Sequence, residues 1–143
     1  MKLVIQRVNS AKLYVDGNLI SSIGKGMCIY VGISRNDTSE EILKFAKKIV
    51  ALRIFENNDK RIGLSIKEIE GEILLIPQFT LFADCWKGNR PDFSCAAKAD
   101  KALRIYQEFV DTIKSLGTSI SLGVFGAHMN IEQDNDGPFT LVL

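Results

Sequence analysis

The sequence predicts an α+β fold in which mostly antiparallel sheets curl into a partly closed barrel with two or three packed helices. Three observations support this prediction. Strand-like segments occupy both ends of the chain, two stretches with helical spacing of apolar residues lie between them, and glycines separate the strands. The chain has 143 residues and contains no Pro/Ser-rich linker, so we expect residues 1–143 to form a single domain.

The N-terminal part of the chain is expected to form strands. Residues 2–9 have strand character, and residues 11–15 and 18–23 flank Asp16-Gly17, a dipeptide that accepts the positive φ angles of a tight hairpin turn. Residues 27–33 form a continuous apolar run, which is typical of a strand buried on both faces.

Two helices follow from capping signals and from the spacing of apolar residues. Thr38 and Glu41 have the spacing of a capping box, in which each side chain satisfies a free backbone N–H group of a new helix. The apolar stripe of this first helix consists of Ile42, Phe45, Ala46, Ile49 and Val50. A second helix is expected over residues 99–116 and ends at Gly117. Its inward-facing residues are expected to be Leu103, Tyr106, Val110 and Ile113.

Further strands are expected between and after the helices. The strand between the helices covers residues 72–80. The C-terminal part contains three more strand-like stretches, at residues 118–124, 129–134 and 139–143. The bends near these stretches contain Gly123, Gly126 and Gly137.

Composition and charge argue against several classes of protein. The formal net charge is +1, so a polyanion such as RNA must be held by a local basic patch. The three cysteines show no C-x-x-C spacing and are expected to be free thiols, which argues against a disulfide framework or a zinc site. The apolar runs are too short to cross a bilayer and the N-terminus has no signal-peptide h-region, so we expect a cytoplasmic protein.

A histidine-based hydrolase is not indicated. His128 is the one histidine, and no G-x-S-x-G, H-E-x-x-H or glycine-rich phosphate motif is present. A partly exposed residue at a strand end is the simpler interpretation of His128. An enzyme with this sequence would therefore work without a histidine triad or a protein-bound zinc cluster.

The first stretch that could carry chemistry is Pro77-Gln78-Phe79-Thr80-Leu81, which follows an apolar strand. The polar groups of Gln78 and Thr80 arrive at a strand end. Because Pro77 provides no donor to a sheet ladder, backbone freed from pairing could aim N–H groups at a developing oxyanion. The alternative is a strand that simply ends at a proline, with Thr80 hydrogen-bonded locally.

The second stretch, Asn135-Asp136-Gly137-Pro138-Phe139-Thr140, is rich in turn formers. A Gly-Pro bond can be cis at low cost, which would direct its neighbouring carbonyl groups so that they accept hydrogen bonds from an ammonium group. An ordinary hairpin turn is the alternative interpretation.

The third stretch is a basic loop at residues 87–93, which joins Lys87 and Arg90 to the aromatic Phe93. Such a loop could hold phosphates while the aromatic ring stacks on a base. A solvated surface is the alternative interpretation. Trp86 beside the loop could lie in the core or at its rim.

Taken together, the order and spacing of these motifs resemble the D-aminoacyl-tRNA deacylase family along the whole chain. The matching motifs are Ile5-Gln6-Arg7-Val8, Leu52-Arg53-Ile54-Phe55, Gly71-Glu72, Gln78-Phe79-Thr80-Leu81, Lys87-Gly88 with Arg90-Pro91, Phe125-Gly126, and Asn135-Asp136-Gly137-Pro138 with Thr140. The resemblance implies hydrolysis of the ester bond between a D-amino acid and the 3′ end of a tRNA. This is a proofreading step in translation quality control, and it would also clear glycyl-tRNA mischarged on tRNA(Ala).

The resemblance also implies partners and roles for individual residues. Two copies would form a homodimer, and a cis Gly137-Pro138 bond would reach into the partner's pocket as the chiral filter. Its carbonyl groups would capture the α-ammonium group, so that an L side chain would collide with backbone. Arg7 would hold this filter in place, and Lys87 and Arg90 would contact the tRNA. Neither a cofactor, a metal ion, DNA nor a membrane is implied.

The expected chemistry requires no histidine. An aminoacyl ester is already activated, and the neighbouring 2′-hydroxyl of the terminal adenosine can assist its hydrolysis. We therefore expect the protein to position and polarise the ester, with backbone N–H groups around Gln78 and Phe79 stabilising the oxyanion. Thr80 is expected to position the substrate, because no base is available to activate it in the alternative role of nucleophile.

Two residues depart from the family pattern. Pro77 stands where Ser is usual, as in related deacylases of mischarged L-alanyl-tRNA, although those have Ala where this chain keeps Phe79. Since Pro77 supplies neither the hydroxyl nor the N–H of Ser, we expect neither to be essential. Phe139 stands where Val is typical, which is a mild exchange. The alternative functions are an L-alanyl-tRNA deacylase, a non-catalytic tRNA-binding module and a purely structural dimer protein.

Overall fold

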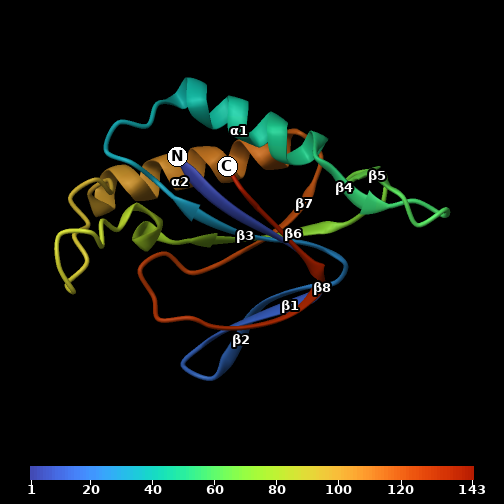
Figure 1. The fold of residues 1–143 in the computed structure, drawn as a ribbon, viewed down its shortest axis with the longest axis horizontal. Coiled ribbons are helices and arrows are strands. Elements are labelled where there is room, and N and C mark those ends of the chain that lie inside the picture. The colour runs from blue at the N-terminus through green and yellow to red at the C-terminus, as the bar shows by residue number, and fades with distance from the viewer.

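The computed structural model describes residues 1–143 and contains eight strands, two α helices and one 3₁₀ helix. In chain order the elements are β1 (Lys2–Val15), β2 (Asn18–Ile23), β3 (Gly26–Gly32), α1 (Ser39–Ala51), β4 (Arg53–Glu56), β5 (Ile62–Ser65), β6 (Glu72–Pro77), η1 (Phe79–Phe82), α2 (Ala99–Ser115), β7 (Ser119–Leu122) and β8 (Asn130–Val142). Figure 1 shows α1 and α2 together on one side of the main sheet, with the β4-β5 hairpin projecting at one end.

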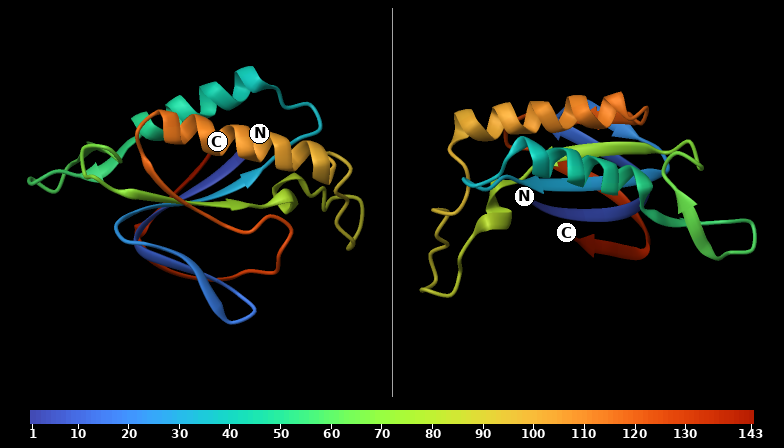
Figure 2. Two further views of the ribbon diagram at one scale, coloured as in Figure 1. Left: turned by 180° about the vertical axis from the view of Figure 1, so that it is seen from behind. Right: turned by 90° about the horizontal axis from the view of Figure 1, so that it is seen from above.

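Six strands form one sheet that nearly closes into a barrel. The order along the sheet is β2-β1-β3-β6-β7, and β8 pairs with β1. β1 runs antiparallel to β2, β3 and β8, whereas β3, β6 and β7 run parallel to one another. The two views in Figure 2 show how the sheet curls away from the helices. The predicted α+β fold with a partly closed, mostly antiparallel barrel is confirmed.

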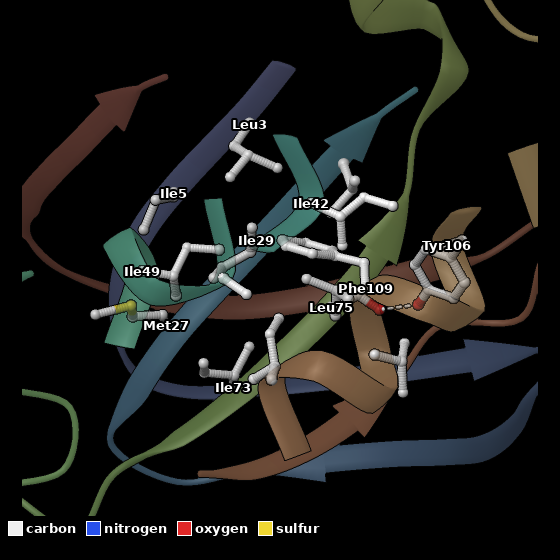
Figure 3. Close-up of a cluster of buried hydrophobic side chains, with 14 of the residues drawn as sticks. Leu3, Ile5, Met27, Ile29, Ile42, Ile49, Ile73, Leu75, Tyr106 and Phe109 are labelled. Atoms are coloured by element: carbon white, nitrogen blue, oxygen red, sulfur yellow. Dashed lines mark hydrogen bonds between the residues drawn. The ribbon is translucent and has the colours of Figure 1, made fainter. Parts of the chain in front are cut away.

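Both helices pack on one face of the sheet. On β3 this face consists of Met27, Ile29 and Val31. Met27 of β3 and Phe109 of α2 belong to this main core, which Figure 3 shows in close-up. The hydroxyl of Tyr106 donates a hydrogen bond to the carbonyl of Leu75 at 2.8 Å, which ties α2 to β6. Cys28 belongs to a second, smaller core on the other face of β3. That core also contains Val8, Ala11, Leu13, Ile23, Leu74 and Ile76. The predicted burial of this strand on both faces is confirmed.

Local signals predicted several element ends correctly. The carboxylate of Glu41 accepts the backbone N–H of Thr38 at 3.0 Å, and α1 begins directly after Thr38. Gly117 follows α2 with a φ of 77°, which is the left-handed conformation expected of a helix stop. The turn between β1 and β2 has φ angles of 49° at Asp16 and 77° at Gly17.

Two pairs of strands that were predicted separately each form one continuous strand in the structure. Residues 2–9 and 11–15 form the single strand β1, and the stretches expected at 129–134 and 139–143 merge into the single strand β8, which covers Asn130–Val142. These two strands pair with each other from Val4 to Tyr14 of β1, with interruptions opposite Arg7 and at the register shift after Val8. This pairing keeps each of them a single strand in spite of the polar residues in its middle.

Two other predictions are wrong, and one hairpin was not predicted. The strand expected over residues 72–80 ends at Pro77, because its partner β3 ends there as well and the chain turns into η1. Leu103 is 48% exposed and not inward-facing, since it lies about a quarter of a turn from the centre of the buried stripe on α2. The β4-β5 hairpin is absent from the prediction, because its strands have 4 residues each and pair irregularly.

Candidate active site

A sharp turn at the end of β6 forms the first part of the candidate site. The N–H of Gln78 donates to the carbonyl of Val31 in β3 at 2.7 Å, and the chain then enters η1. This turn lies against Gly32, where a Cβ atom would be 2.9 Å from the Cβ of Leu81 and 3.2 Å from the carbonyl oxygen of Gln78. Glycine at position 32 therefore lets η1 pack on the end of β3.

The turn presents polar groups that a substrate could contact. The side-chain amide of Gln78 donates a hydrogen bond to the hydroxyl oxygen of Thr80. The N–H groups of Phe79 and Thr80 begin η1 and have no backbone acceptor. Of the N–H groups around Gln78 and Phe79, that of Gln78 itself is not free, because it completes the pairing with β3. The free donors are those of Phe79 and Thr80.

A mostly apolar cavity of about 330 Å³ lies beside this turn. Gln78 and Phe79 line it, and the loop between β7 and β8 contributes residues 125–129. Phe79 is 56% exposed, and its ring meets that of Phe93 edge to face at a centroid distance of 5.0 Å. Apolar walls with a few polar groups are typical of sites for small organic groups.

The loop at residues 125–129 is the part of the site that the sequence interpretation missed. It carries His128 and Met129 to the cavity, although His128 was expected to have no role there. His128 is exposed and precedes the first residue of β8, as expected for a residue near a strand end. The motif Phe125-Gly126 was the one sequence signal in this loop, and Phe125 and Gly126 both line the cavity.

The segment Gly137-Pro138 bulges out of the ladder between β1 and β8. The residues of β1 on either side of Arg7 pair with Asn135 and Thr140, so residues 136–139 lie opposite Arg7 alone. The Gly137-Pro138 bond is cis, and both residues are exposed. Neither lines the cavity beside η1 of the same chain. The segment is a bulge within β8 and not a hairpin turn.

Arg7 connects this bulge to the rest of the fold. Its side chain is 5% exposed, and Nε lies 2.9 Å from the carboxylate of Asp136 and 3.3 Å from the carbonyl oxygen of the same residue. Nη1 donates to the carbonyl of Ile54 in β4 at 2.7 Å. The guanidinium group also lies 5.0 Å from the ring centre of Phe139, as in a cation–π contact. Arg7 therefore contacts both ends of the bulge and β4.

The basic loop after η1 is a short surface hairpin. Backbone hydrogen bonds of 2.8 Å and 2.9 Å between Asp84 and Asp92 close it. The ammonium group of Lys87 lies 3.8 Å from the carboxylate of Asp84, and Arg90 is exposed. Trp86 is 96% exposed, so it lies at the rim and not in the core.

Other reactive groups do not gather at this site. No group of three or more His, Cys, Asp and Glu side chains is placed to hold a metal ion. The cysteines are free thiols as predicted, and burial raises the pKa of the Cys28 thiol to about 12.

Neither α helix has the length and apolar content needed to cross a bilayer.

Comparisons with known sequences show that the chain belongs to one family. The family model described as D-Tyr-tRNA(Tyr) deacylase matches residues 4–143. A protein of Dictyoglomus turgidum named D-aminoacyl-tRNA deacylase is 48% identical over 143 residues, which are 100% of this chain and 92% of that protein. A protein of the same name from Clostridium perfringens is 44% identical over 100% of this chain and 96% of its own length.

Solved structures share the fold. The one described as "c-Myc DNA Unwinding Element Binding Protein" has a TM-score of 0.95 and 39% identity, covering 100% of this chain and 97% of its own. The one described as "Structural Analysis of a probable eukaryotic D-amino acid tRNA deacylase" has a TM-score of 0.85 and 19% identity, covering 99% and 97%. The resemblance seen in the sequence motifs is confirmed. The chain belongs to the D-Tyr-tRNA(Tyr) deacylase family, whose members in Dictyoglomus and Clostridium are named D-aminoacyl-tRNA deacylase.

Proposed function

We propose that this chain hydrolyses the ester bond of D-aminoacyl-tRNA at the end of β6 and releases the free D-amino acid and the tRNA. Membership of the deacylase family supports the reaction. The observation that supports the site is the pair of free N–H groups on Phe79, which lines a mostly apolar cavity, and on Thr80, which follows it in the chain. The alternative of an L-alanyl-tRNA deacylase is not favoured by the family comparisons.

In the proposed reaction the protein positions the ester and polarises its carbonyl group. Attack of water on the ester carbonyl places negative charge on its oxygen, and the N–H groups of Phe79 and Thr80 would donate to that oxyanion. In other hydrolases one such donor contributes roughly 3 kcal/mol to stabilisation of the transition state. The attacking water gives up a proton, and collapse of the tetrahedral intermediate breaks the bond to the ribose oxygen. The neighbouring 2′-hydroxyl can relay that proton to the leaving ribose oxygen, so that the products are the free amino acid and the tRNA.

The chiral filter is assigned to Gly137 and Pro138 of a second copy in a homodimer. Both residues are exposed on the β8 bulge, and neither lines the cavity of its own chain. In the partner's cavity their carbonyl groups would accept hydrogen bonds from the α-ammonium group of the substrate. A D side chain would then face open space, whereas an L side chain would meet backbone. Glycine has no side chain to reject, so glycyl-tRNA mischarged on tRNA(Ala) is a further substrate.

The acceptor end of the tRNA is assigned to the basic loop. Lys87 and Arg90 are exposed on it, and cations at such positions neutralise phosphates. A local patch is needed because the net charge of the whole chain is only +1. Aminoacyl-tRNA is made and used in the cytoplasm, which is therefore the proposed location of the protein.

A turnover assay with D-tyrosyl-tRNA tests the proposed function. We expect multiple turnovers that release free D-tyrosine. A non-catalytic binding module would retain the tRNA in a salt-sensitive way without hydrolysis, and a purely structural dimer protein would do neither. Duplex DNA serves as a competitor, because one structural relative is named for binding a DNA element. We expect excess duplex DNA to leave the rate unchanged, and a complete block by it would count against the proposal.

A further inference from the structure

A second cleft, with a volume of about 480 Å³, opens at the far end of η1. Its walls include Lys2, Arg35, Asn36, Phe82, Asp84 and Trp86. We propose that this cleft binds the single-stranded nucleotides that precede the terminal adenosine of the substrate tRNA. The inference rests on the proposed function and adds a second binding surface for the same substrate.

The position of the cleft suits this role. Phe79, at the start of η1, lines the candidate active-site cavity, whereas Phe82, at its end, lines the cleft. A 3₁₀ helix rises about 2 Å per residue, so these two positions are about 6 Å apart along its axis. Neighbouring nucleotides of a single strand span such a distance. A strand whose last ribose lies at η1 therefore has its preceding nucleotide at the cleft.

The wall of the cleft contains two cationic residues, Lys2 and Arg35. The ammonium group of Lys2 donates to the carbonyl of Leu81 at 3.1 Å and lies 4.8 Å from the ring centre of Phe82, so η1 holds it in place. Arg35 is exposed on the loop that follows β3. The ammonium group of Lys101 donates a hydrogen bond to the backbone carbonyl oxygen of Arg35. These positive groups suit a phosphate backbone.

The one acidic side chain in the cleft wall is already partnered. The carboxylate of Asp84 accepts the backbone N–H of Trp86 at 3.0 Å and lies 3.8 Å from the ammonium group of Lys87. Its charge is therefore offset within the loop, and the same contacts fix the backbone that carries the indole.

Trp86 supplies the second feature of a single-strand site. Its side chain is 96% exposed, so the indole contributes almost nothing to the core. A large aromatic ring exposed beside cations is the arrangement on which unpaired bases stack, and stacking accepts any base because each has a π face. The cleft thus combines a charged groove with a stacking platform.

Intrinsic fluorescence tests the cleft without any hydrolysis, because Trp86 is the only tryptophan. The probe is a four-nucleotide RNA with the 3′ sequence of tRNA, and a blunt RNA duplex is the control. We expect saturable quenching by the single strand that weakens as salt rises, and little quenching by the duplex. Unchanged fluorescence at millimolar single strand, or equal quenching by the duplex, would overturn the inference.

Kinetics of Trp86→Ala separate the cleft from the reaction. The two substrates are D-tyrosyl-tRNA and the D-tyrosyl ester of adenosine, which lacks the preceding nucleotides. We expect kcat/KM to fall roughly fivefold to one-hundredfold with the tRNA, the range for loss of one stacked base, and the loss to be absent with the adenosine ester. Ile62→Ala, at a residue that is 52% exposed on β5, is the matched control and should leave both rates unchanged.

The outcomes distinguish the inference from the proposed function. An equal loss on both substrates, or no loss on the tRNA, would contradict the cleft. If the wild-type chain hydrolyses neither substrate, the proposed function fails, and the fluorescence titration still decides whether the cleft binds single-stranded RNA. Arg35→Gln provides a second variant, and we expect it to reduce the salt dependence of RNA binding while the adenosine ester reacts at the wild-type rate.

Discussion

Thr80 presents a hydroxyl whose oxygen already accepts a hydrogen bond from the amide of Gln78. The hydroxyl proton is not used in this bond and can be donated to a substrate, which suits a positioning residue. Thr80→Val keeps the shape and removes the hydroxyl. We expect kcat to fall about fivefold, since one neutral hydrogen bond contributes about 1 kcal/mol. Rapid-quench kinetics on both proteins provide the measurement. Abolished turnover in the variant, together with a covalent acyl-enzyme trapped on the wild-type chain, would show a nucleophile instead.

Arg7 is buried and makes charged hydrogen bonds to the bulge that carries the proposed filter. Arg7→Met should lower the free energy of unfolding by about 2 kcal/mol, because hydrogen bonds to charged groups contribute roughly 1.5–3 kcal/mol. We also expect the D/L ratio of hydrolysis rates to fall, with partial rescue by Arg7→Lys. Urea unfolding and paired rate measurements test both effects. Arg104→Met, at an exposed position on α2, is the control.

A purely structural role for Arg7 would give a different result. The variant would then unfold at lower urea concentration, yet it would keep the wild-type D/L ratio at temperatures where it is folded. That outcome would remove Arg7 from the positioning of the filter.

The parallel pairing of β3 with β6 depends on a close approach of two backbones. A Cβ atom at Gly26 would lie 1.8 Å from the carbonyl oxygen of Glu72, its partner in the register. We therefore expect Gly26→Ala to destabilise the fold by about 3 kcal/mol, at the upper end of overpacking effects. Thermal and urea unfolding measure this loss. Gly63→Ala is the control, because its nearest contact would be 4.0 Å away. Equal stability of the two variants would contradict the described pairing.

Elements that depend on local interactions could be predicted from the sequence. The start of α1 is set by Thr38 and Glu41, which lie three residues apart, and the end of α2 is set by Gly117. The β1-β2 turn at Asp16 and Gly17 is equally local. Each signal lies within one turn of the boundary that it determines, so a single sequence contains all the information required.

Elements that depend on distant partners could not be predicted. The turn η1 forms because Gly32, far away in sequence, leaves room for Leu81. The burial of Arg7 depends on Ile54 and Asp136, which are 47 and 129 residues away in sequence. For the candidate site, motif resemblance selected the stretches around Gln78 and Gly137, whose roles remain predictions. It could not show that the N–H of Gln78 is occupied or that the 125–129 loop forms a cavity wall, because both are results of tertiary packing.

At the scale of the whole molecule, the candidate active-site cavity and the Gly137-Pro138 bulge lie in separate places on one chain. A bulge that acts as the filter would therefore have to serve the cavity of a second chain. Mixed dimers test whether the filter acts between chains. One partner is wild type and the other carries Phe79→Pro, which deletes one of the two proposed donor N–H groups, together with Pro138→Ala, which replaces the proline of the filter. If the filter acts between chains, the working site faces the altered bulge, and the mixed dimer hydrolyses L-tyrosyl-tRNA. Neither parent dimer should do so.

Differential tags allow the mixed dimer to be purified, and light scattering shows whether the chain forms dimers. A mixed dimer that spares L-tyrosyl-tRNA as strictly as the wild type would mean that each filter serves its own chain. A wild-type protein that remains monomeric at assay concentrations would exclude the shared site.

Discrimination between D- and L-aminoacyl-tRNA depends on all three proposed parts, which are the cavity that holds the substrate, the bulge that acts as the filter and Arg7 that positions the bulge. The direct measurement is the initial rate of ester hydrolysis by the wild-type protein on D-tyrosyl-tRNA and L-tyrosyl-tRNA, prepared on the same tRNA and compared at equal concentrations. We expect the D form to be released at least about one hundredfold faster. Equal rates, or faster release of the L form, would contradict this expectation.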